Sequence, residues 1–328
     1  MKVNKIIKMN GTSVIGVLSG KGGVGKTTLV ANLGAALASE FSKKVLLIDS
    51  NVKTSHLGLH LGLYEELPVT LREVLLKKVP VMYAIFLHPS TGLRLLPAPI
   101  KGNMDLKKMD GIVKELKTAY NPILVDCAPG LGKDVVIAAK AIDKAILITT
   151  PDLPAVTDTL KTIELMKRFK KDIIGIVLNR VENQKYELTV EEIESTCGYD
   201  VISIIPESNK IPESIAEGMP VVMNSGCPAA TEFKRLAASL VGEEYQPAGL
   251  WYKLKQLLGI STVSTRKMSI PRKHKAVFVR EGDVGKEEQK LIKEKAFEEV
   301  YAAAEKLGED VEKEVMEKVK EKLRKRLA

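Results

Sequence analysis

The sequence has few cysteines and few aromatic residues. Its 328 residues include three cysteines, and aromatic side chains make up 5% of the chain, with Trp251 as the single tryptophan. The cysteines lie far apart and form no C-x-x-C pair, which argues against a disulfide framework or a zinc site. We therefore expect three buried, inert thiols, at Cys127, Cys197 and Cys227.

Long apolar runs are also absent. No stretch is long and apolar enough to span a bilayer, and the basic residues 1–10 lack the apolar core of a signal peptide. We therefore expect a protein that is made and kept in the cytoplasm. With 45% hydrophobic residues, the chain is long enough for one large domain and an extension.

Acidic residues are missing from one stretch, between Glu244 and Glu281, in a chain whose formal net charge is +9. A local cluster of basic residues favours an anionic partner, either a membrane surface or nucleic acid. The basic residues of this stretch are Lys253, Lys255, Arg266, Lys267, Arg272, Lys273, Lys275 and Arg280.

The glycine-rich residues 19–28 carry the clearest chemistry. The apolar run Val14–Leu18 before them is typical of a buried strand, and residues 28–37 have a helical pattern. The spacing matches G-x-x-x-x-G-K-[ST], a loop whose backbone N–H groups bind phosphate oxygens. We expect Lys26 to reach the β- and γ-phosphates and Thr27 to bind Mg²⁺; a glycine-rich turn without a ligand is the alternative. The predicted nucleotide-binding residues here are Gly20, Lys21, Gly22, Gly23, Val24, Gly25, Lys26, Thr27 and Thr28.

Further apolar runs alternate with helical patterns. This alternation predicts an α/β fold of the P-loop NTPase type, a mostly parallel twisted sheet with helices on both faces, plus a C-terminal helical extension. Thr70 and Glu73 form a capping box that opens a short helix, and residues 81–99 favour short strands around a turn. The predicted strands are residues 44–49, 122–126, 145–150, 173–179 and 201–206, and the predicted helices are residues 104–120, 155–169, 190–196 and 229–240.

Two of the predicted strands end in a carboxylate, Asp49 and Asp126. Ligands of parallel sheets bind at the carboxyl ends of strands, where the loop of residues 19–28 also lies. We therefore expect Asp49 and Asp126 to hold Mg²⁺ together with Thr27. The alternative for both carboxylates is a role as helix caps at strand–helix junctions.

With Lys21 added to these residues, the sequence resembles the deviant Walker A ATPases of the MinD/ParA family over about residues 12–245. The family motif Lys-Gly-Gly-x-Gly-Lys-Thr stands here at residues 21–27, and the resemblance extends to residues 126–130 and 150–152. It implies ATP and Mg²⁺ as cofactors and an ATP-bound homodimer in which Lys21 reaches the partner's nucleotide. Residues 57–62 favour the MinD branch. The likeness assigns adenine binding to Asn179, Arg180, Pro206 and Glu207.

The chain departs from the family at Asn51, where MinD proteins have a second aspartate that helps to position the attacking water. An amide can orient water but cannot accept its proton. We therefore predict slow ATP hydrolysis, with Lys21, Lys26 and Asn51 as the catalytic residues; a neutral substitution is the alternative.

Beyond the predicted ATPase domain of residues 1–245, the chain changes character. Residues 249–259 place leucines on one helical face beside Trp251, with lysines toward the other side, as in helices that lie on membranes. Packing of this face on the protein's own core is the alternative. Residues 246–284 are expected to hold this segment and a basic linker, and residues 285–328 a charged helical extension. The predicted membrane-binding residues are Leu250, Trp251, Leu254, Leu257 and Leu258.

Together these features favour a MinD-like ATPase that dimerises with ATP and binds anionic membrane reversibly and peripherally. It would position or recruit an unidentified protein partner, as in the spatial regulation of cell division. Two alternatives stay open: a ParA-like protein that binds DNA without sequence preference, and a weakly hydrolysing ATP-bound scaffold.

Overall fold

The computed structural model describes residues 12–52, 55–65, 67–100, 104–224 and 226–245, and the backbone of residues 279–280. The predicted membrane-binding segment, most of the basic linker and the charged extension lie outside these residues, as do the domain boundaries predicted near 284. Within the described part, no helix has the length and hydropathy needed to cross a membrane.

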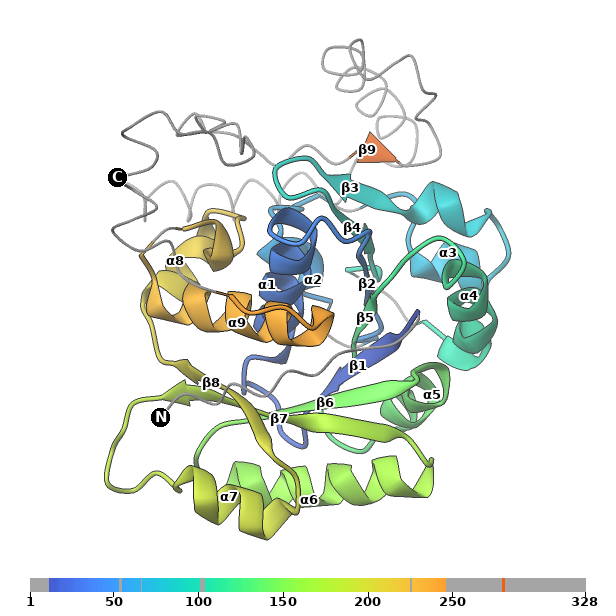
Figure 1. The fold of residues 1–328 in the computed structure, drawn as a ribbon. Coiled ribbons are helices and arrows are strands. Elements are labelled where there is room, and N and C mark those ends of the chain that lie inside the picture. The colour runs from blue at the N-terminus through green and yellow to red at the C-terminus, as the bar shows by residue number, and fades with distance from the viewer. Residues whose placement is uncertain are drawn as a thin grey trace, which may run out of the picture. The chain divides into compact units, whose positions relative to one another are not determined.

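The described residues form one nine-stranded sheet with the order β8-β7-β6-β1-β5-β2-β4-β3-β9 (Figure 1). Neighbouring strands are parallel from β8 to β4, whereas β3 is antiparallel to both β4 and β9. Strands such as β1 and β5 are buried along their whole length, as expected for a sheet covered on both faces. The strands are β1 Val14–Leu18, β2 Leu46–Asp49, β3 Phe86–His88, β4 Leu93–Leu96, β5 Ile123–Asp126, β6 Lys144–Thr149, β7 Asp172–Val181, β8 Val201–Pro206 and β9 Val279–Arg280.

Helices cover both faces of the sheet, and each face has its own hydrophobic core. On one face α1 and α9 supply most of the helical core residues, and on the other α3 to α7 supply them (Figure 1). The helices are α1 Lys26–Ser39, α2 Leu57–His60, α3 Leu71–Leu75, α4 Met109–Leu116, α5 Lys133–Ala141, α6 Leu153–Arg168, α7 Val190–Cys197, α8 Lys210–Ala216 and α9 Pro228–Val241, with 3₁₀ turns η1 Val81–Ala84, η2 Leu106–Lys108 and η3 Val221–Met223.

The strand register places the ends of the central strands together. Val17 of β1 pairs with Asp126 of β5, and Asp126 pairs with Asp49 of β2 on its other side. The loop that follows β1 therefore meets both carboxylates at the carboxyl edge of the sheet, where ligands of this fold class bind.

The predicted α/β class, the parallel strands and the longer helices are confirmed, and Thr70 and Glu73 form the predicted capping box. The three cysteines are free and buried, and burial raises the pKa of Cys127 to about 12, so that thiol is inert. The prediction of strand structure was wrong for Val81–Ala84, which forms the 3₁₀ turn η1. Its backbone hydrogen bonds are local, with Tyr83 N–H donating to Pro80 O at 3.2 Å and Ile85 N–H to Met82 O at 3.4 Å. Residues 279–280, predicted as linker, pair with β3 as the edge strand β9.

Candidate functional site

The glycine-rich loop connects β1 to α1, and Gly25 is the N-cap residue of this helix. Its φ of +94° lies in the left-handed region that favours glycine, and a Cβ atom there would lie 2.2 Å from Nδ2 of Asn179. Gly20 is equally restricted, because a Cβ atom would lie 2.2 Å from the backbone oxygen of Asp158 in α6. The loop is therefore packed between β7 and α6, and it leads directly into the N-terminus of a helix, where phosphate binds favourably.

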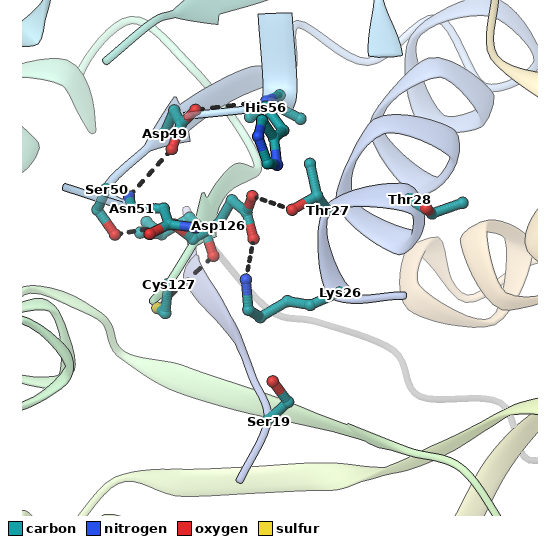
Figure 2. A network of polar contacts seen from close by, with 12 residues as sticks. Ser19, Lys26, Thr27, Thr28, Asp49, Ser50, Asn51, His56, Asp126 and Cys127 are labelled. Atoms are coloured by element: carbon teal, nitrogen blue, oxygen red, sulfur yellow. Dashed lines mark hydrogen bonds and ion pairs between the residues drawn. The ribbon is translucent and has the colours of Figure 1, made fainter. Parts of the chain in front are cut away.

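Asp126, at the end of β5, holds the two functional side chains of the loop (Figure 2). Lys26 Nζ lies 2.7 Å from Asp126 Oδ1, and the Thr27 hydroxyl donates to Asp126 Oδ2 at 2.7 Å. The Asp126 side chain is 1% exposed and that of Lys26 is 7% exposed, so this ion pair is buried. The structure thus brings together three residues that the sequence assigns to phosphate and Mg²⁺.

Asp49, at the end of β2, organises the loop that follows it. Its Oδ1 accepts from the backbone N–H of Asn51 at 3.0 Å, and its Oδ2 accepts from the Ser55 hydroxyl at 2.9 Å. Burial and the neighbouring charge of Asp126 raise the pKa of Asp49 to about 7. The site therefore buries two carboxyl groups beside the single ammonium group of Lys26.

These residues fit Mg²⁺ bound together with a phosphate. The hydroxyl of Thr27 and the carboxylates of Asp126 and Asp49 are oxygen donors, and a cation would offset the charge of the buried carboxylate pair. In the part of the chain that the structure describes, no group of three or more His, Cys, Asp or Glu side chains could hold a metal ion alone. Mg²⁺ in nucleotide sites commonly takes one or two carboxylates and completes its shell with phosphates and water.

The predicted adenine-binding residues lie on neighbouring strands, at the ends of β7 and β8. Asn179 donates through Nδ2 to the backbone oxygen of Val24 at 2.8 Å, whereas its buried Oδ1 has no hydrogen-bond partner. A buried acceptor without a donor is rare in proteins and fits the exocyclic amino group of adenine. Arg180 and Glu207 form an ion pair at 3.7 Å next to it, so the structure brings these residues together.

Lys21 lies apart from the buried cluster. Its side chain is 49% exposed, and its Nζ lies 3.9 Å from Oδ1 of Asp152, which is 39% exposed. Asp152 also caps α6, because the same oxygen accepts from the backbone N–H of Ala155 at 3.0 Å. The loop therefore contains two lysines in different surroundings.

Sequence reasoning missed a contact between the loop and α2. His60 Nδ1 donates to the backbone oxygen of His56 at 2.9 Å, which leaves Nε2 to accept from the Thr28 hydroxyl at 3.2 Å. Burial lowers the pKa of His60 and favours this neutral form. His60 thus ties the segment after β2 to the start of α1; the spacing of the two histidines gave no sign of this partner.

The fold and this site define a P-loop nucleotide-binding protein. The family model described as "CobQ/CobB/MinD/ParA nucleotide binding domain" matches residues 15–221. The chain belongs to this family, and its relatives place it in the MinD branch.

Two curated relatives are similar over most of their length. An uncharacterized ATP-binding protein of Methanocaldococcus jannaschii is 37% identical over 71% of this chain and 89% of its own. The septum site-determining protein MinD of Thermotoga maritima is 34% identical over 70% of this chain and 89% of its own.

Solved structures of MinD proteins have the same fold. MinD of Pyrococcus horikoshii in complex with Mg-ADP is 31% identical, covers 76% of this chain and 98% of its own, and superposes with a TM-score of 0.65. The MinC:MinD complex of Aquifex aeolicus is 32% identical, covers 77% of this chain and 99% of its own, and gives a TM-score of 0.64.

Proposed function

We propose that this protein is an ATPase that uses Mg-ATP to close a homodimer and bind a membrane surface, where it positions partner proteins in the manner of cell-division regulators. The observation that carries the proposal is the pair of lysines in one loop: Lys26 is buried at the nucleotide site and Lys21 is half exposed beside it. The relative bound to Mg-ADP and the relative in complex with MinC support the cofactor and the existence of a protein partner.

Each residue of the buried cluster has a role in this proposal. The backbone N–H groups of the loop and the ammonium group of Lys26 bind the phosphates. Thr27, Asp126 and Asp49 would hold Mg²⁺, which would offset negative charge on the phosphates. Asn179 accepts a hydrogen bond from the adenine amino group through Oδ1, which is unpartnered in the described structure. Hydrolysis adds water to the terminal phosphorus and breaks its bond to the bridging oxygen, giving ADP and phosphate.

Lys21 is suited to act on a nucleotide in the partner protomer. Its ion pair with Asp152 is long and exposed, and such surface pairs contribute at most about 1 kcal/mol. The ammonium group can therefore leave Asp152 at little cost and approach the phosphates of a second copy. A cation supplied in this way stabilises charge in the transition state of phosphoryl transfer.

Light scattering with ADP and with ATP tests the dimer. The wild type is expected to double its molar mass with ATP, whereas Lys21→Ala stays monomeric and still binds ATP. Lys114→Ala is the matched control, because it removes a lysine from another exposed ion pair, 2.7 Å from Asp110, away from the loop. A wild type that stays monomeric with ATP, or a Lys21→Ala protein that dimerises as well as the wild type, contradicts the proposal.

Slow hydrolysis is a second part of the proposal and rests on Asn51. Asn51 is almost fully buried after β2, and its own backbone N–H donates to Asp49 Oδ1 at 3.0 Å. Asn51→Asp should raise ATP turnover about tenfold or more, because a carboxylate can accept the proton of the attacking water. Phosphate release measures this effect, with Asn183→Asp in an exposed loop as the control, and an unchanged rate contradicts it.

Membrane binding is proposed for the segment that contains Leu250, Trp251, Leu254, Leu257 and Leu258. Two copies of a weakly binding segment in one dimer gain affinity because they bind together. Trp251 fluorescence should shift to the blue with anionic vesicles and ATP but not with ADP. A response to DNA that falls steeply with salt, in place of a response to vesicles, supports the ParA-like alternative.

A further inference from the structure

The outer edge of the sheet, at β3 and β9, joins two stretches of chain that lack acidic residues. One runs from residue 74 to residue 104 and contains β3; the other runs from residue 245 to residue 280 and ends in β9. The two strands lie side by side (Figure 1) and pair in antiparallel register, with Arg280 opposite Phe86; β9 also contacts η1. Residues 279–280, the last two of this basic stretch, therefore lie at this edge of the sheet.

Next to this edge, α3 and η1 expose an unusual set of side chains. Leu76 is 57% exposed and Tyr83 is 45% exposed, and both are among the large hydrophobic side chains exposed in the described structure. Lys77 and Lys78, which follow Leu76, are exposed as well. We call Leu76, Lys77, Lys78 and Tyr83 the edge patch.

The backbone at Lys77 is one that glycine would favour. Lys77 has a φ of +58° and follows the end of α3, where its N–H donates to Val74 O at 2.9 Å and the Lys78 N–H donates to Glu73 O at 3.0 Å. This is the closing turn that usually has glycine in the left-handed position. The fold thus keeps a lysine at a position where glycine would be more stable.

No neighbouring acid in the sequence neutralises the edge patch. Glu73, the acidic residue before it, uses its carboxylate inside α3, where it accepts from the Thr70 N–H at 2.8 Å and from Arg72 Nε at 2.9 Å. The charge of Lys77 and Lys78 therefore faces solvent next to the exposed Leu76, and Tyr83 is exposed on η1, which packs against α3. That combination is typical of surfaces that contact anionic lipid.

We infer that the edge patch is a second membrane contact of this protein, built into the folded ATPase domain. The inference rests on the proposed membrane function, since the β9 pairing connects the patch to the basic stretch that follows the proposed membrane-binding segment. Lys77 and Lys78 face lipid headgroups, while Leu76 and Tyr83 enter the interface between headgroups and acyl chains. Lys77, Lys78 and Tyr83 suit either ligand, but Leu76 favours lipid, because leucine offers a nucleic acid neither charge nor an aromatic ring to stack on bases.

The test uses the full chain with ATP and vesicles of phosphatidylcholine with and without phosphatidylserine. Lys77→Gly should bind the anionic vesicles about fivefold more weakly, the effect of one lysine near an anionic surface, and should unfold at a higher temperature than the wild type. Leu76→Ser with Tyr83→Ser should weaken binding by tenfold or more. Neither change should alter ATP-dependent dimerisation.

Two control variants match these changes elsewhere on the surface. Lys170 occupies the same position after α6, with φ of +52° and the same two closing hydrogen bonds, so Lys170→Gly should stabilise the protein and leave vesicle binding unchanged. Tyr186, 74% exposed in the loop after β7, gives the control Tyr186→Ser.

The outcomes separate the inference from the proposed function. If the wild type binds anionic vesicles and both edge-patch variants bind equally well, the inference is wrong and the proposed function stands. Loss of DNA binding in Lys77→Gly, with vesicle binding retained, also overturns it. A wild type that dimerises with ATP but ignores all vesicles overturns both the inference and the membrane part of the proposed function.

Discussion

Lys21 and Lys26 stand five residues apart in one loop, yet their surroundings are opposite. Lys26 lies 2.7 Å from a carboxylate that is 1% exposed, in a cluster fixed by the pairing of β1, β5 and β2. Lys21 lies 3.9 Å from a carboxylate that is 39% exposed, at the N-terminus of α6. The carboxylate that each lysine contacts therefore predicts the behaviour of that lysine better than its position in the motif does.

The difference separates two kinds of site. A buried ion pair is costly to break on one side only, whereas an exposed pair is worth little and exchanges readily. The buried cluster should behave as part of the folded core, and the exposed pair as a group free to change partners. Substitutions in the buried cluster and at the exposed ion pair test this contrast.

The largest effect is expected for Lys26→Ala. It leaves Asp126 buried without its cation and should lower the free energy of unfolding by about 3–5 kcal/mol, with loss of ATP binding. Lys21→Ala should change the free energy of unfolding by no more than about 0.5 kcal/mol. Urea denaturation and calorimetric titration with ATP measure both proteins, and equal destabilisation by the two changes contradicts the contrast.

A second prediction concerns the pH dependence of stability. The pKa of Asp49 is about 7 in the folded protein and 3.8 is its ordinary value, so between these values the folded protein holds a proton that the unfolded chain releases. This contribution is present at low pH and is lost as pH rises through 7. Between pH 4 and pH 8, the free energy of unfolding of Asp49→Asn should rise by about 2–4 kcal/mol relative to that of the wild type. Urea denaturation in EDTA measures this difference.

The control is Asp152→Asn, the same substitution at the carboxylate of the exposed ion pair. Burial lowers the pKa of His88 to about 4, so His88 destabilises the folded protein as the pH falls below 6.5, the ordinary pKa of histidine. This effect is the same in the wild type and in Asp49→Asn, so it cancels in the difference between their curves. Parallel curves for the wild type and Asp49→Asn would show that folding does not raise the pKa of Asp49.

The smallest effect comes from two glycines of the loop. Gly25→Ala combines a left-handed backbone with a contact of 2.2 Å to Asn179, whereas Gly23→Ala has a similar φ of +82° but nothing within 4 Å. We expect the free energy of unfolding to fall by about 2–3 kcal/mol for Gly25→Ala and by about 1 kcal/mol for Gly23→Ala, measured by thermal unfolding. ATP affinity should fall more for Gly25→Ala. Equal losses would mean that the backbone conformation alone matters.

The parts of the site that sequence predicts are local or follow from a simple rule of parallel sheets. The spacing of Gly20, Gly25, Lys26 and Thr27 specifies the loop, and buried strands that end in a carboxylate place Asp49 and Asp126 at one edge. The capping box at Thr70 is readable for the same reason, because its two residues lie within one turn of helix.

The remaining contacts join residues that are distant in sequence and carry no pattern of their own. The approach of Asp158 to Gly20, the ion pair of Lys21 with Asp152 and the hydrogen bond of His60 to Thr28 depend on how α6 and α2 pack against the loop. The short helices α2 and α8 and the strand β9 were missed because too few residues form them to show a period. Helix α5, with alanine on several sides, was missed because its pattern is weak.

The contacts of Asp126 with Lys26 and Thr27 also affect which anions can bind at the site. A bare phosphate ion would draw Lys26 away and leave a buried carboxylate without a cation. Mg²⁺ bound together with a phosphate would supply a cation for Asp126, so the carboxylate would keep a cationic partner when Lys26 contacts the phosphate. We therefore expect the site to bind metal-bound nucleotide in preference to inorganic phosphate.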